Sequence, residues 1–326
     1  MNTILLTGGL GYIGSHIAVE LLLQEHNVII IDNIQNSSIK MLEIIEKETN
    51  KSPIFYKEDM MNFENVNNIF EKHKIDIVIH LAGLKSVNES IVNPIYYYQN
   101  NLSILFNLLK VMNNHNCKNI IFSSSSTVYG NSNPPYTENS QTGIGITNPY
   151  GKTKYYQEEI LKDLYKSNNN WNIIILRYFN PISSRNNKMK ETPKGVPNNL
   201  FPYLMKVYNG EMDELKIFGN NYDTKDGTCS RDFIHVVDVA KGHVRVCDYI
   251  KENNKLFKIY NLGTGEGVTV QELINSFEKV NNIKLNYRYV ERREGDLDKS
   301  YGDVSLIEKE LGWKTEYKLE DMVRIN

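Results

Sequence analysis

The feature that most constrains the fold of this chain is a glycine-rich turn near its N-terminus. Residues 2–7 form a short apolar run, and Thr7-Gly-Gly-Leu-Gly-Tyr-Ile-Gly14 follows it directly. Glycines with this spacing allow a tight turn, let backbone amides approach a pyrophosphate, and let the next helix pack closely on the strand. Asp32 ends the next β-branched run, where a carboxylate hydrogen-bonds the ribose hydroxyls of NAD and repels the 2′-phosphate of NADP. The N-terminal part is therefore predicted to bind NAD.

Short β-branched runs alternate with longer polar or amphipathic stretches through the first half of the chain. Runs that are apolar almost throughout are typical of parallel strands buried on both faces of a sheet. We predict strands over residues 2–7, 28–32, 54–57, 76–80, 119–123 and 172–177. The alternation predicts an α/β fold, a Rossmann-type doubly wound parallel sheet, in a domain that spans residues 1–180.

After residue 180 the pattern becomes irregular, and residues 192–199 are rich in turn-forming residues. Residues 181–326 are predicted to form a smaller, mixed α/β domain that binds the substrate. Within it, residues 239–249 are typical of a helix and residues 258–262 of a strand. We expect this part, about residues 236–262, to pack back on the first domain.

Composition excludes several classes of partner. The formal net charge is -2, which gives no reason to expect a nucleic acid or an anionic membrane as partner. Three cysteines without Cys-x-x-Cys spacing indicate neither a disulfide framework nor a zinc site, and we predict no metal. No stretch approaches the roughly 20 apolar residues of a membrane span, and no secretory leader is evident. These features favour a cytoplasmic protein.

A second motif carries candidate chemistry. Asn148-Pro149 predicts a helix start, because Asn caps free amides and Pro suits the first turn. Tyr150 and Lys154, four residues apart on that helix, share one face. A tyrosine acting as a base near neutral pH needs a pKa lowered from about 10 to roughly 7 or 8, and a nearby ammonium contributes to this.

The serine-rich stretch Ser123-Ser-Ser-Ser-Thr-Val-Tyr-Gly130 continues the predicted strand at 119–123. Ligands of open α/β sheets bind beyond the carboxyl ends of the strands, so these hydroxyls are expected to face the nicotinamide and the substrate. Together, Tyr150, Lys154 and the serine run suggest a base, a charge that tunes it, and hydroxyls that hold a substrate oxygen.

With these residues in place, the chain resembles the extended short-chain dehydrogenase/reductases and, more closely, the UDP-galactose 4-epimerase family. The similarity runs nearly end to end. The motifs that carry it lie at residues 7–16, 32–37, 81–85, 97–101, 123–127, 148–154, 176–181, 197–200, 217–219, 231–236 and 292–296.

The resemblance implies a catalytic mechanism. Tyr150 takes the proton from the hexose 4-hydroxyl, with Ser125 in the same hydrogen-bond network, while the hydride on carbon 4 passes to bound NAD. Lys154 holds the nicotinamide ribose and, with the positive nicotinamide ring, lowers the pKa of the tyrosine. The resulting 4-keto sugar rotates and takes the hydride back on its other face. The family also implies a homodimer.

The resemblance further implies two sets of binding residues. The cofactor contacts are Gly8, Gly11, Tyr12, Ile13, Gly14, Asp32, Asn33, Asn36, Ser37, Asp59, Met60, Leu81, Ala82, Gly83, Lys85, Asn100, Ser123, Tyr150, Lys154 and Tyr178. The UDP-hexose contacts are Lys85, Ser125, Thr127, Tyr150, Tyr178, Asn180, Asn199, Leu200, Lys216, Ile217, Phe218, Arg231, Arg293, Asp296 and Ser300. Arg231 and Arg293 match the pyrophosphate ligands, for which guanidinium forks are suited.

Two departures from the family pattern bear on function. After Asn180-Pro181 the family usually continues Gly-Ala-His, whereas this chain has Ile182-Ser-Ser-Arg-Asn-Asn187. At Ser300, glucose-restricted members often have Tyr. A smaller side chain leaves room for an N-acetyl group on carbon 2, so we hypothesise that UDP-N-acetylglucosamine and UDP-N-acetylgalactosamine are also accepted. Tyr301 stands one residue later and would fill that space in a shifted alignment.

Three alternatives remain open at this point. A nucleotide-sugar 4,6-dehydratase shares the glycine, serine and Tyr-x-x-x-Lys motifs, but its family places an Asp-Glu pair where this chain has Ser126-Thr127. A UDP-glucuronate epimerase or decarboxylase is the second alternative. A catalytically silent NAD-binding regulator is the third, although such members tend to lose the Tyr or Lys that stand here.

Overall fold

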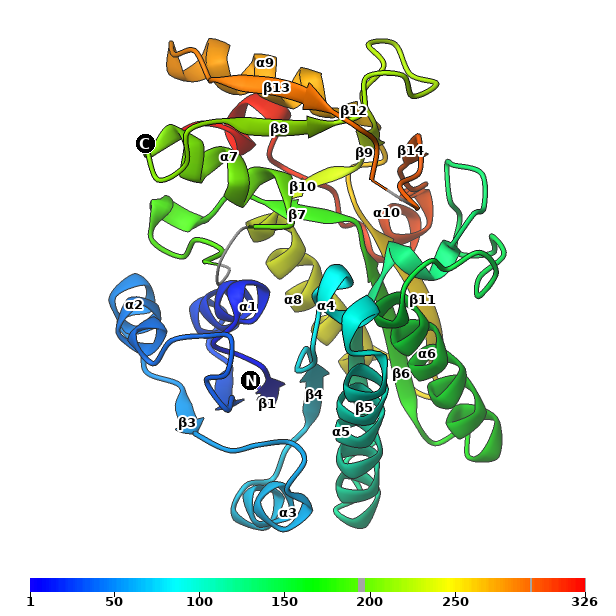
Figure 1. The fold of residues 1–326 in the computed structure, drawn as a ribbon. Coiled ribbons are helices and arrows are strands. Elements are labelled where there is room, and N and C mark those ends of the chain that lie inside the picture. The colour runs from blue at the N-terminus through cyan, green and yellow to red at the C-terminus, as the bar shows by residue number, and fades with distance from the viewer. Residues whose placement is uncertain (193–196, 294, 326) are drawn as a thin grey trace.

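The computed structural model describes residues 1–192, 197–293 and 295–325. A seven-stranded parallel sheet forms its centre, with the strand order β11-β6-β5-β4-β1-β2-β3 (Figure 1). This order reverses next to β1, which is the doubly wound arrangement. The strands are β1 (Thr3–Thr7), β2 (Asn27–Ile31), β3 (Ile54–Tyr56), β4 (Ile77–His80), β5 (Asn119–Ser125), β6 (Asn172–Tyr178) and β11 (Phe257–Leu262).

The predicted Rossmann-type fold is confirmed, and its strands lie where the β-branched runs predicted them. β4 and β6 are buried along their whole length because helices cover both faces of the sheet. β5 continues two residues beyond its predicted end, since Ser124 and Ser125 pair with Arg177 and Tyr178 of β6. The serine run therefore enters the sheet and then leads into the 3₁₀ turn η1 (Ser126–Tyr129).

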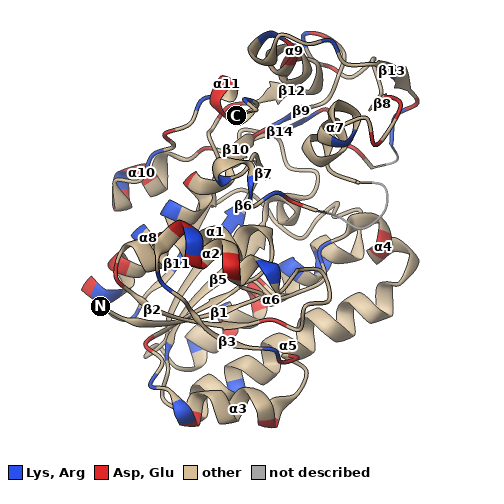
Figure 2. Cartoon of the chain, turned by 90° about the vertical axis from the view of Figure 1, so that its left-hand side faces the viewer, with Lys and Arg blue, Asp and Glu red and all other residues tan. Residues whose placement is uncertain are grey.

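Two layers of helices enclose the sheet. Figure 2 shows α1 and α2 on one side of it and α3 and α5 on the other. Each layer has its own hydrophobic core against the sheet. The first layer consists of α1 (Tyr12–Leu23), α2 (Lys40–Thr49), α8 (Val236–Glu252) and α10 (Ser305–Leu311). The second consists of α3 (Phe63–Lys72), α5 (Pro94–Asn114) and α6 (Pro149–Ser167), with the short α4 (Val87–Val92) preceding α5.

Most of the remaining chain forms a smaller lobe beyond the carboxyl ends of the central strands (Figure 1). Its helices α7, α9 and α11 and its strands share a separate core that includes Leu215, Leu273 and Phe277. Its strand pairs are β7 (Asn180–Ile182) with β10 (Phe233–His235), and β8 (Leu215–Phe218) with β13 (Tyr287–Val290). β9 (Ser230–Arg231) lies between β12 (Val268–Thr269) and β14 (Lys299–Ser300). The helices are α7 (Leu200–Tyr208), α9 (Val270–Asn281) and α11 (Leu319–Met322), and η2 (Arg185–Asn187) is a 3₁₀ turn.

The chain returns to the central sheet after entering the smaller lobe. β11 pairs in parallel with β6, and α8 packs on α1. We propose that residues 1–180 together with about 236–262 form the cofactor-binding unit and that most of the rest binds the substrate. The turn-rich stretch expected at 192–199 lies partly outside the described residues, because residues 193–196 are not described.

Candidate active site

The glycine-rich loop lies against the segment that follows β4. Gly8 has a φ of 71°, and a Cβ on it would come within 2.9 Å of the backbone N of Ala82. A Cβ on Gly14 would lie 2.4 Å from the carbonyl oxygen of Gly8. Only glycine fits either position, so the backbone forms a cradle next to residues 81–83, as the binding of a pyrophosphate requires.

Asp32 lies immediately after β2, beside this loop. Its Oδ2 accepts the N–H of Leu10 at 3.0 Å, and its Oδ1 accepts the N–H of Ile34 and the hydroxyl of Ser37, each at 2.8 Å. A carboxylate has about four acceptor positions, so capacity remains for a ribose hydroxyl. These bonds also fix the carboxylate, because two of its donors belong to the backbone.

The predicted adenine side is exposed and polar, apart from one methionine. Asn33 and Asp59 are joined by a hydrogen bond of 3.1 Å, and Asn36 lies exposed on the same segment as Asn33. Met60 is buried against the second core. Asn100, on α5, hydrogen-bonds the neighbouring Asn101, whose side chain also holds the backbone of Leu84.

Lys154 is held at the end of β5 by the local structure of α6. The helix starts as predicted, with the Asn148 side chain accepting the N–H of Gly151 at 2.8 Å and Pro149 in the first turn. Nζ of Lys154 donates to the carbonyl oxygen of Ser123 at 2.6 Å. Burial lowers the pKa of Lys154 to about 8, and the carboxylate of Glu158 acts in the opposite direction. The ammonium therefore contacts the backbone of the serine run, and Glu158 offsets only part of the cost of burying its charge.

Tyr150 lies one helical turn before Lys154 and reaches Ser125. Burial raises the pKa of the phenol, and the hydrogen bond with Ser125 lowers it. Lys154, which was expected to lower this pKa, is not one of these two influences. The chain's own groups therefore leave Tyr150 protonated at neutral pH, and its use as a base requires a further positive charge bound beside it. A cationic nicotinamide ring fits this requirement.

Tyr178 joins the same cluster and has a partner that the sequence did not reveal. Its hydroxyl donates to Nε2 of His243 at 2.6 Å, while Nδ1 of His243 donates to the carbonyl oxygen of Val239 at 2.8 Å. Burial lowers the pKa of His243 to about 4, which keeps the ring neutral. Burial raises the pKa of Tyr178, the hydrogen bond with Ser123 lowers it, and the neighbouring Tyr150 raises it further. The sequence could have indicated this pair only through the presence of a histidine on the buried face of the predicted helix at 239–249.

Two buried polar atoms at the strand ends have no partner among the described residues. One is Oγ1 of Thr127, in the turn after β5, and the other is Nε2 of His80, the last residue of β4. Nδ1 of His80 is paired with the hydroxyl of Thr7 at 2.7 Å. Unpaired buried polar atoms are costly, so their position here fits a site that binds a polar ligand. Thr127 was predicted to contact substrate, whereas His80 was not singled out.

A buried ion pair supports the strands that carry the serines. The carboxylate of Glu158 binds the guanidinium of Arg177 at 2.7 and 3.0 Å and accepts the hydroxyl of Ser124 at 2.5 Å. Arg177 also lies over the ring of Tyr129 at 4.8 Å. Glu158 is one turn beyond Lys154 on α6, so helical periodicity could have identified it.

The predicted pyrophosphate ligands lie in the smaller lobe. Arg231 donates to the carbonyl oxygen of Leu297 at 2.8 Å and to Asp296 at 3.1 Å. The guanidinium of Arg293 stacks on the ring of Phe218 at 3.9 Å. Asp296 links the two arginines, because its carboxylate accepts from Arg231 and its N–H donates to the carbonyl oxygen of Arg293 at 3.3 Å. The two arginines therefore converge on one region.

Other predicted contacts are more dispersed. Lys85 forms an ion pair with Glu191 at 2.5 Å, and Asn199 lies 3.3 Å from both carboxylate oxygens of the same residue. Ile217 is buried in the core of the smaller lobe and Leu200 packs against that core, so a ligand would meet their backbone more readily than their side chains. Lys216 is exposed on β8. Glu191 was not predicted, because it is far from Lys85 along the chain and belongs to no motif.

The last predicted contacts occupy the edges of the site. Asn180 begins β7, and Ser300 pairs with Arg231 between β14 and β9. On α1, Ile13 packs on the first core and the hydroxyl of Tyr12 donates to the carbonyl oxygen of Ser183 at 2.7 Å.

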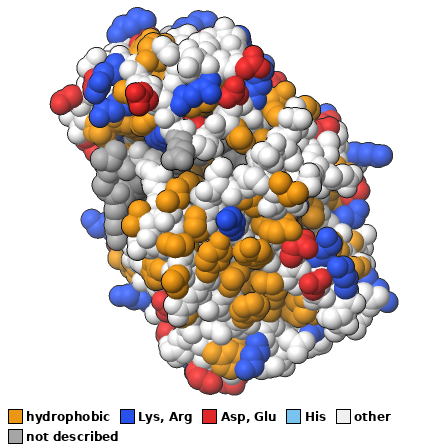
Figure 3. Space-filling model, turned by 45° about the vertical axis from the view of Figure 1, so that its right-hand side comes forward, with side chains coloured by type: hydrophobic (Ala, Val, Ile, Leu, Met, Phe, Trp, Pro, Cys, Tyr) orange, Lys and Arg blue, Asp and Glu red, His pale blue; other side chains and the backbone are white. Residues whose placement is uncertain are grey.

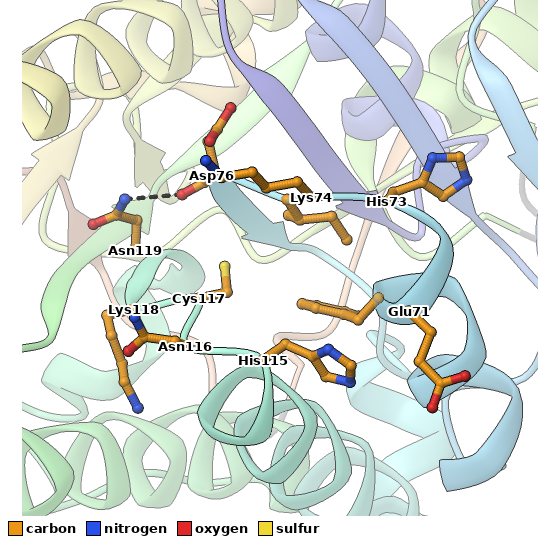
Figure 4. A pocket seen from close by; sticks show the side chains of 11 residues that line it. Glu71, His73, Lys74, Asp76, His115, Asn116, Cys117, Lys118 and Asn119 are labelled. Atoms are coloured by element: carbon orange, nitrogen blue, oxygen red, sulfur yellow. Dashed lines mark hydrogen bonds between the residues drawn. The ribbon is translucent and has the colours of Figure 1, made fainter.

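A polar hollow of about 460 Å³ lies elsewhere, at the amino ends of β4 and β5 (Figure 4). His73 pairs there with Tyr56 at 2.8 Å, and His115 pairs with Asn67 at 2.9 Å. The residues described above gather at the opposite, carboxyl ends of the strands. This hollow is therefore separate from the candidate active site.

The described part of the chain contains no group of three or more His, Cys, Asp or Glu side chains arranged to hold a metal ion. Within the same residues, no helix combines the length and apolarity needed to cross a membrane.

The chain matches a family model, curated relatives and solved structures over nearly its whole length. A family model described as GDP-mannose 4,6 dehydratase matches residues 5–326. UDP-glucose 4-epimerase from Haemophilus influenzae is 46% identical over 323 residues, which covers 98% of this chain and 95% of that protein. The crystal structure of UDP-glucose 4-epimerase from Bifidobacterium longum in complex with NAD+ and UDP has a TM-score of 0.94 and 48% identity, covering 98% of this chain and 96% of that one. The enzyme from Stenotrophomonas maltophila, with bound NAD and formylated UDP-arabinopyranose, has a TM-score of 0.96 and 40% identity, covering 99% and 96%.

Proposed function

The chain belongs to the UDP-glucose 4-epimerase family of extended short-chain dehydrogenase/reductases, and we propose how its own residues interconvert UDP-galactose and UDP-glucose. The observation that carries this proposal is the cluster of Tyr150, Ser125 and Lys154 at the end of β5, beside the glycine cradle. This cluster brings together three features: the phenol of Tyr150, which can accept or donate a proton; the buried ammonium of Lys154; and a dinucleotide site. The enzyme is an NAD-dependent isomerase.

The residues of the site fit NAD. Gly8 and Gly14 form a cradle that a side chain would fill, and Asp32 keeps free acceptor capacity for the ribose. Lys154 lies at the end of β5, where it can hold the ribose attached to the nicotinamide. When bound, NAD supplies the oxidant that removes hydride from carbon 4 of the sugar and the reductant that returns it.

The chain's own part in the reaction is to move a proton and to hold the nucleotide. Tyr150 accepts the proton of the sugar 4-hydroxyl, and Ser125 shares a hydrogen bond with the same phenol oxygen. Inversion also requires that the sugar present its other face while the nucleotide stays in place. Arg231 and Arg293 lie in the smaller lobe, away from Tyr150 on α6, so a grip on the pyrophosphate leaves the sugar free to turn.

The dehydratase alternative has support from the description of the matching family model. Dehydration needs an acid that releases water from carbon 6 of the sugar. Ser126 and Thr127 occupy the turn η1, where the dehydratase family has an Asp-Glu pair. The region next to Ser125 therefore has hydroxyls in place of the acid, which favours epimerisation.

The test is to incubate the purified protein with UDP-galactose, without added NAD, and to separate the products. We expect UDP-glucose, because the cofactor is regenerated in each turnover. Tyr150→Phe is expected to lose most of this activity while it retains NAD. A 6-deoxy-4-keto sugar as product would select the dehydratase, and unchanged turnover by Tyr150→Phe would exclude the proposed base.

We further propose that N-acetylated UDP-hexoses are substrates. Successive side chains of a strand point to opposite faces, and a Cβ on Gly267 would lie 2.9 Å from the ring of Tyr301. Ser300 therefore points the other way, toward Tyr136, and it acts to lower the pKa of that phenol. Since Tyr301 is directed toward Gly267, its ring does not fill the space that a tyrosine at position 300 would occupy.

The matched comparison is wild type against Ser300→Tyr, each with UDP-galactose and UDP-N-acetylgalactosamine. We expect wild type to convert both substrates and Ser300→Tyr to lose the N-acetylated one selectively. Wild-type protein that converts only UDP-galactose would end this proposal.

We also propose a homodimer that forms through α4, α5 and α6. Figure 3 shows hydrophobic side chains gathered on one face of the molecule. Val92 and Ile95 are 76% and 79% exposed, and such contiguous apolar surface is typical of a protein–protein interface. The exposed apolar residues of these helices are Ile91, Val92, Ile95, Tyr96, Phe106 and Tyr156. Phe106→Glu is expected to yield monomers in light scattering, whereas Ile39→Glu, on the other side of the sheet, is the matched control.

We propose a cytoplasmic location as well. Cys117, Cys229 and Cys247 are free and buried, which is typical of a reducing compartment. Fractionation of cells that express the tagged protein tests this, and recovery in a secreted fraction would contradict it.

A further inference from the structure

The segment 183–189, which follows β7, contacts one face of α1 through successive turns. The hydroxyl of Tyr12 donates to the carbonyl oxygen of Ser183 at 2.7 Å, and the N–H of Arg185 donates to Nε2 of His16 at 3.1 Å. The guanidinium of Arg185 pairs with the carboxylate of Glu20. Tyr12, His16 and Glu20 are spaced by four residues, so they form a single stripe along the helix. The segment lies over α1 and α2 in Figure 1.

The ion pair is shielded from solvent. The side chains of Glu20 and Arg185 are 9% and 21% exposed, and Nε of Arg185 is buried without a partner among the described residues. Burial lowers the pKa of His16 to about 4, which keeps the ring neutral, and its Nδ1 donates to the carbonyl oxygen of Tyr12 at 2.8 Å. Nε2 is therefore the acceptor for Arg185. Removing one charge of a shielded pair leaves the other unpaired, so each partner depends on the other.

The segment adopts a conformation that other contacts must hold. Ser183, Asn186 and Asn187 have φ values of 72°, 49° and 55°, in the left-handed region, which Asn adopts readily but Ser does not. Met189 anchors the end of the segment in the first core. On α2, Glu48 accepts hydrogen bonds from Asn186 at 2.8 Å and from Lys188 at 3.0 Å.

The position of α1 matters because the glycine loop leads directly into it. Gly11 is its N-cap, and Tyr12 is its first residue. A change in the position of α1 therefore changes the cradle formed by Gly8 and Gly14. The same segment continues from β7, which begins at Asn180 on the substrate side. It thus joins the smaller lobe to the helix that positions the cofactor.

We propose that Arg185 is a positioning residue that, through Glu20 and His16, holds α1 in the geometry that binds NAD tightly. The Ser-Ser-Arg sequence performs this role where the family usually has Gly-Ala-His. The proposal rests on NAD as the cofactor and is independent of which sugar is converted. Its effect is on NAD affinity, because none of the contacts of Arg185 within the described part of the chain reaches Tyr150 or Ser125.

The test compares NAD binding by wild type, Arg185→Met and Glu20→Gln, measured by titration calorimetry and by the rate at which the holoenzyme loses NAD on dilution. We expect each variant to bind NAD about tenfold more weakly, within the usual range of coupling between a remote contact and a site. Lys258→Met is the matched control. It removes an ion pair with Glu310, between β11 and α10, whose two side chains are 34% and 26% exposed and so less shielded than Arg185 and Glu20. This variant is expected to bind NAD as wild type does.

A charge exchange separates positioning from general destabilisation. Glu20→Arg combined with Arg185→Glu is expected to recover NAD affinity, and Arg185→Lys is expected to lose less of it than Arg185→Met. Equal NAD affinity in Arg185→Met and Lys258→Met would overturn the proposal. So would a loss of thermal stability in Arg185→Met without a change in NAD affinity. Wild-type protein that fails to bind NAD would instead refute the proposed function itself.

Discussion

His243 accepts the hydroxyl proton of Tyr178 across 2.6 Å, inside the first core and next to the candidate active site. The histidine can only act as acceptor there, because its other nitrogen donates to the carbonyl oxygen of Val239. The phenol oxygen of Tyr178 is thereby left to accept a hydrogen bond, and Ser123 is the partner beside it. A helix of the first layer thus determines which way a tyrosine of the site donates.

Replacement of His243 by Phe is expected to lower turnover. The change removes the acceptor, so the buried hydroxyl of Tyr178 loses its partner at a cost of about 1–3 kcal/mol and turns toward other groups. We expect kcat to fall by about tenfold with a smaller change in KM, measured in the UDP-galactose assay. Tyr178→Phe combined with His243→Phe tests the mechanism, because the second change then has little further effect. Full additivity of the two effects would contradict this coupling.

Stability at alkaline pH is expected to depend on Lys154. Its pKa is lowered to about 8 by burial, below the usual value near 10.5, so between these values the unfolded chain binds more protons than the folded chain. Stability contributed by this residue therefore rises as the pH increases from about 8 to 10.5. Urea unfolding of the NAD-free protein should show this rise in wild type relative to Lys154→Met. A constant difference between the two proteins across that range would contradict the lowered pKa.

Replacement of Asp32 by Asn is expected to weaken NAD binding and to relax the preference against NADP. The carboxylate supplies an acceptor for the ribose and repels a 2′-phosphate, whereas an amide does neither as well. We expect about tenfold weaker binding of NAD and a smaller change for NADP, both measured by calorimetry. Glu43→Gln, at an exposed carboxylate on α2 outside the predicted site, is the control for a general loss of negative charge. A ratio of NAD to NADP affinity that stays unchanged in Asp32→Asn would argue against this role.

Replacement of Glu158 by Ala is expected to destabilise the fold strongly. Arg177 would remain buried without its carboxylate, and breaking a buried pair in this way costs roughly 3–5 kcal/mol. Urea unfolding measures the loss, with Glu159→Ala as the control, because the side chain of Glu159, the next residue of α6, is 44% exposed and pairs with Lys162 at 3.5 Å. Similar midpoints for the two variants would show that the pair contributes little.

The sequence predicted most of the central sheet because its strands satisfy a purely local requirement. The runs at 76–80 and 172–177 are β-branched and apolar on both faces, so each is recognisable without its neighbours. The extension of β5 to Ser125 was not predicted, since serine has no strand preference and the pairing with Tyr178 comes from a neighbouring strand. Local signals thus locate strands more reliably than their ends.

The residues of the candidate site likewise fall into those that local motifs predict and those that only the fold reveals. Gly14, Asp32, Tyr150 and Lys154 belong to motifs with fixed spacing, so the sequence identified them, although their individual roles stay predictions. His243 and Glu191 have no such spacing: each becomes a candidate only through a partner far away in the chain. The expected lowering of the Tyr150 pKa by Lys154 illustrates a further limit, because burial depends on the whole fold and here acts in the opposite direction.

The pairing of β11 with β6 has a consequence for how the protein can be divided. A fragment ending at residue 180 would lack the outermost strand, leaving the backbone of β6 open to strands from other molecules and α1 without the helix that covers it. Such a truncated piece is therefore expected to aggregate. The regions proposed to bind the nucleotide cofactor and the sugar are each built from segments of both halves of the chain, so neither half is expected to fold as an independent domain.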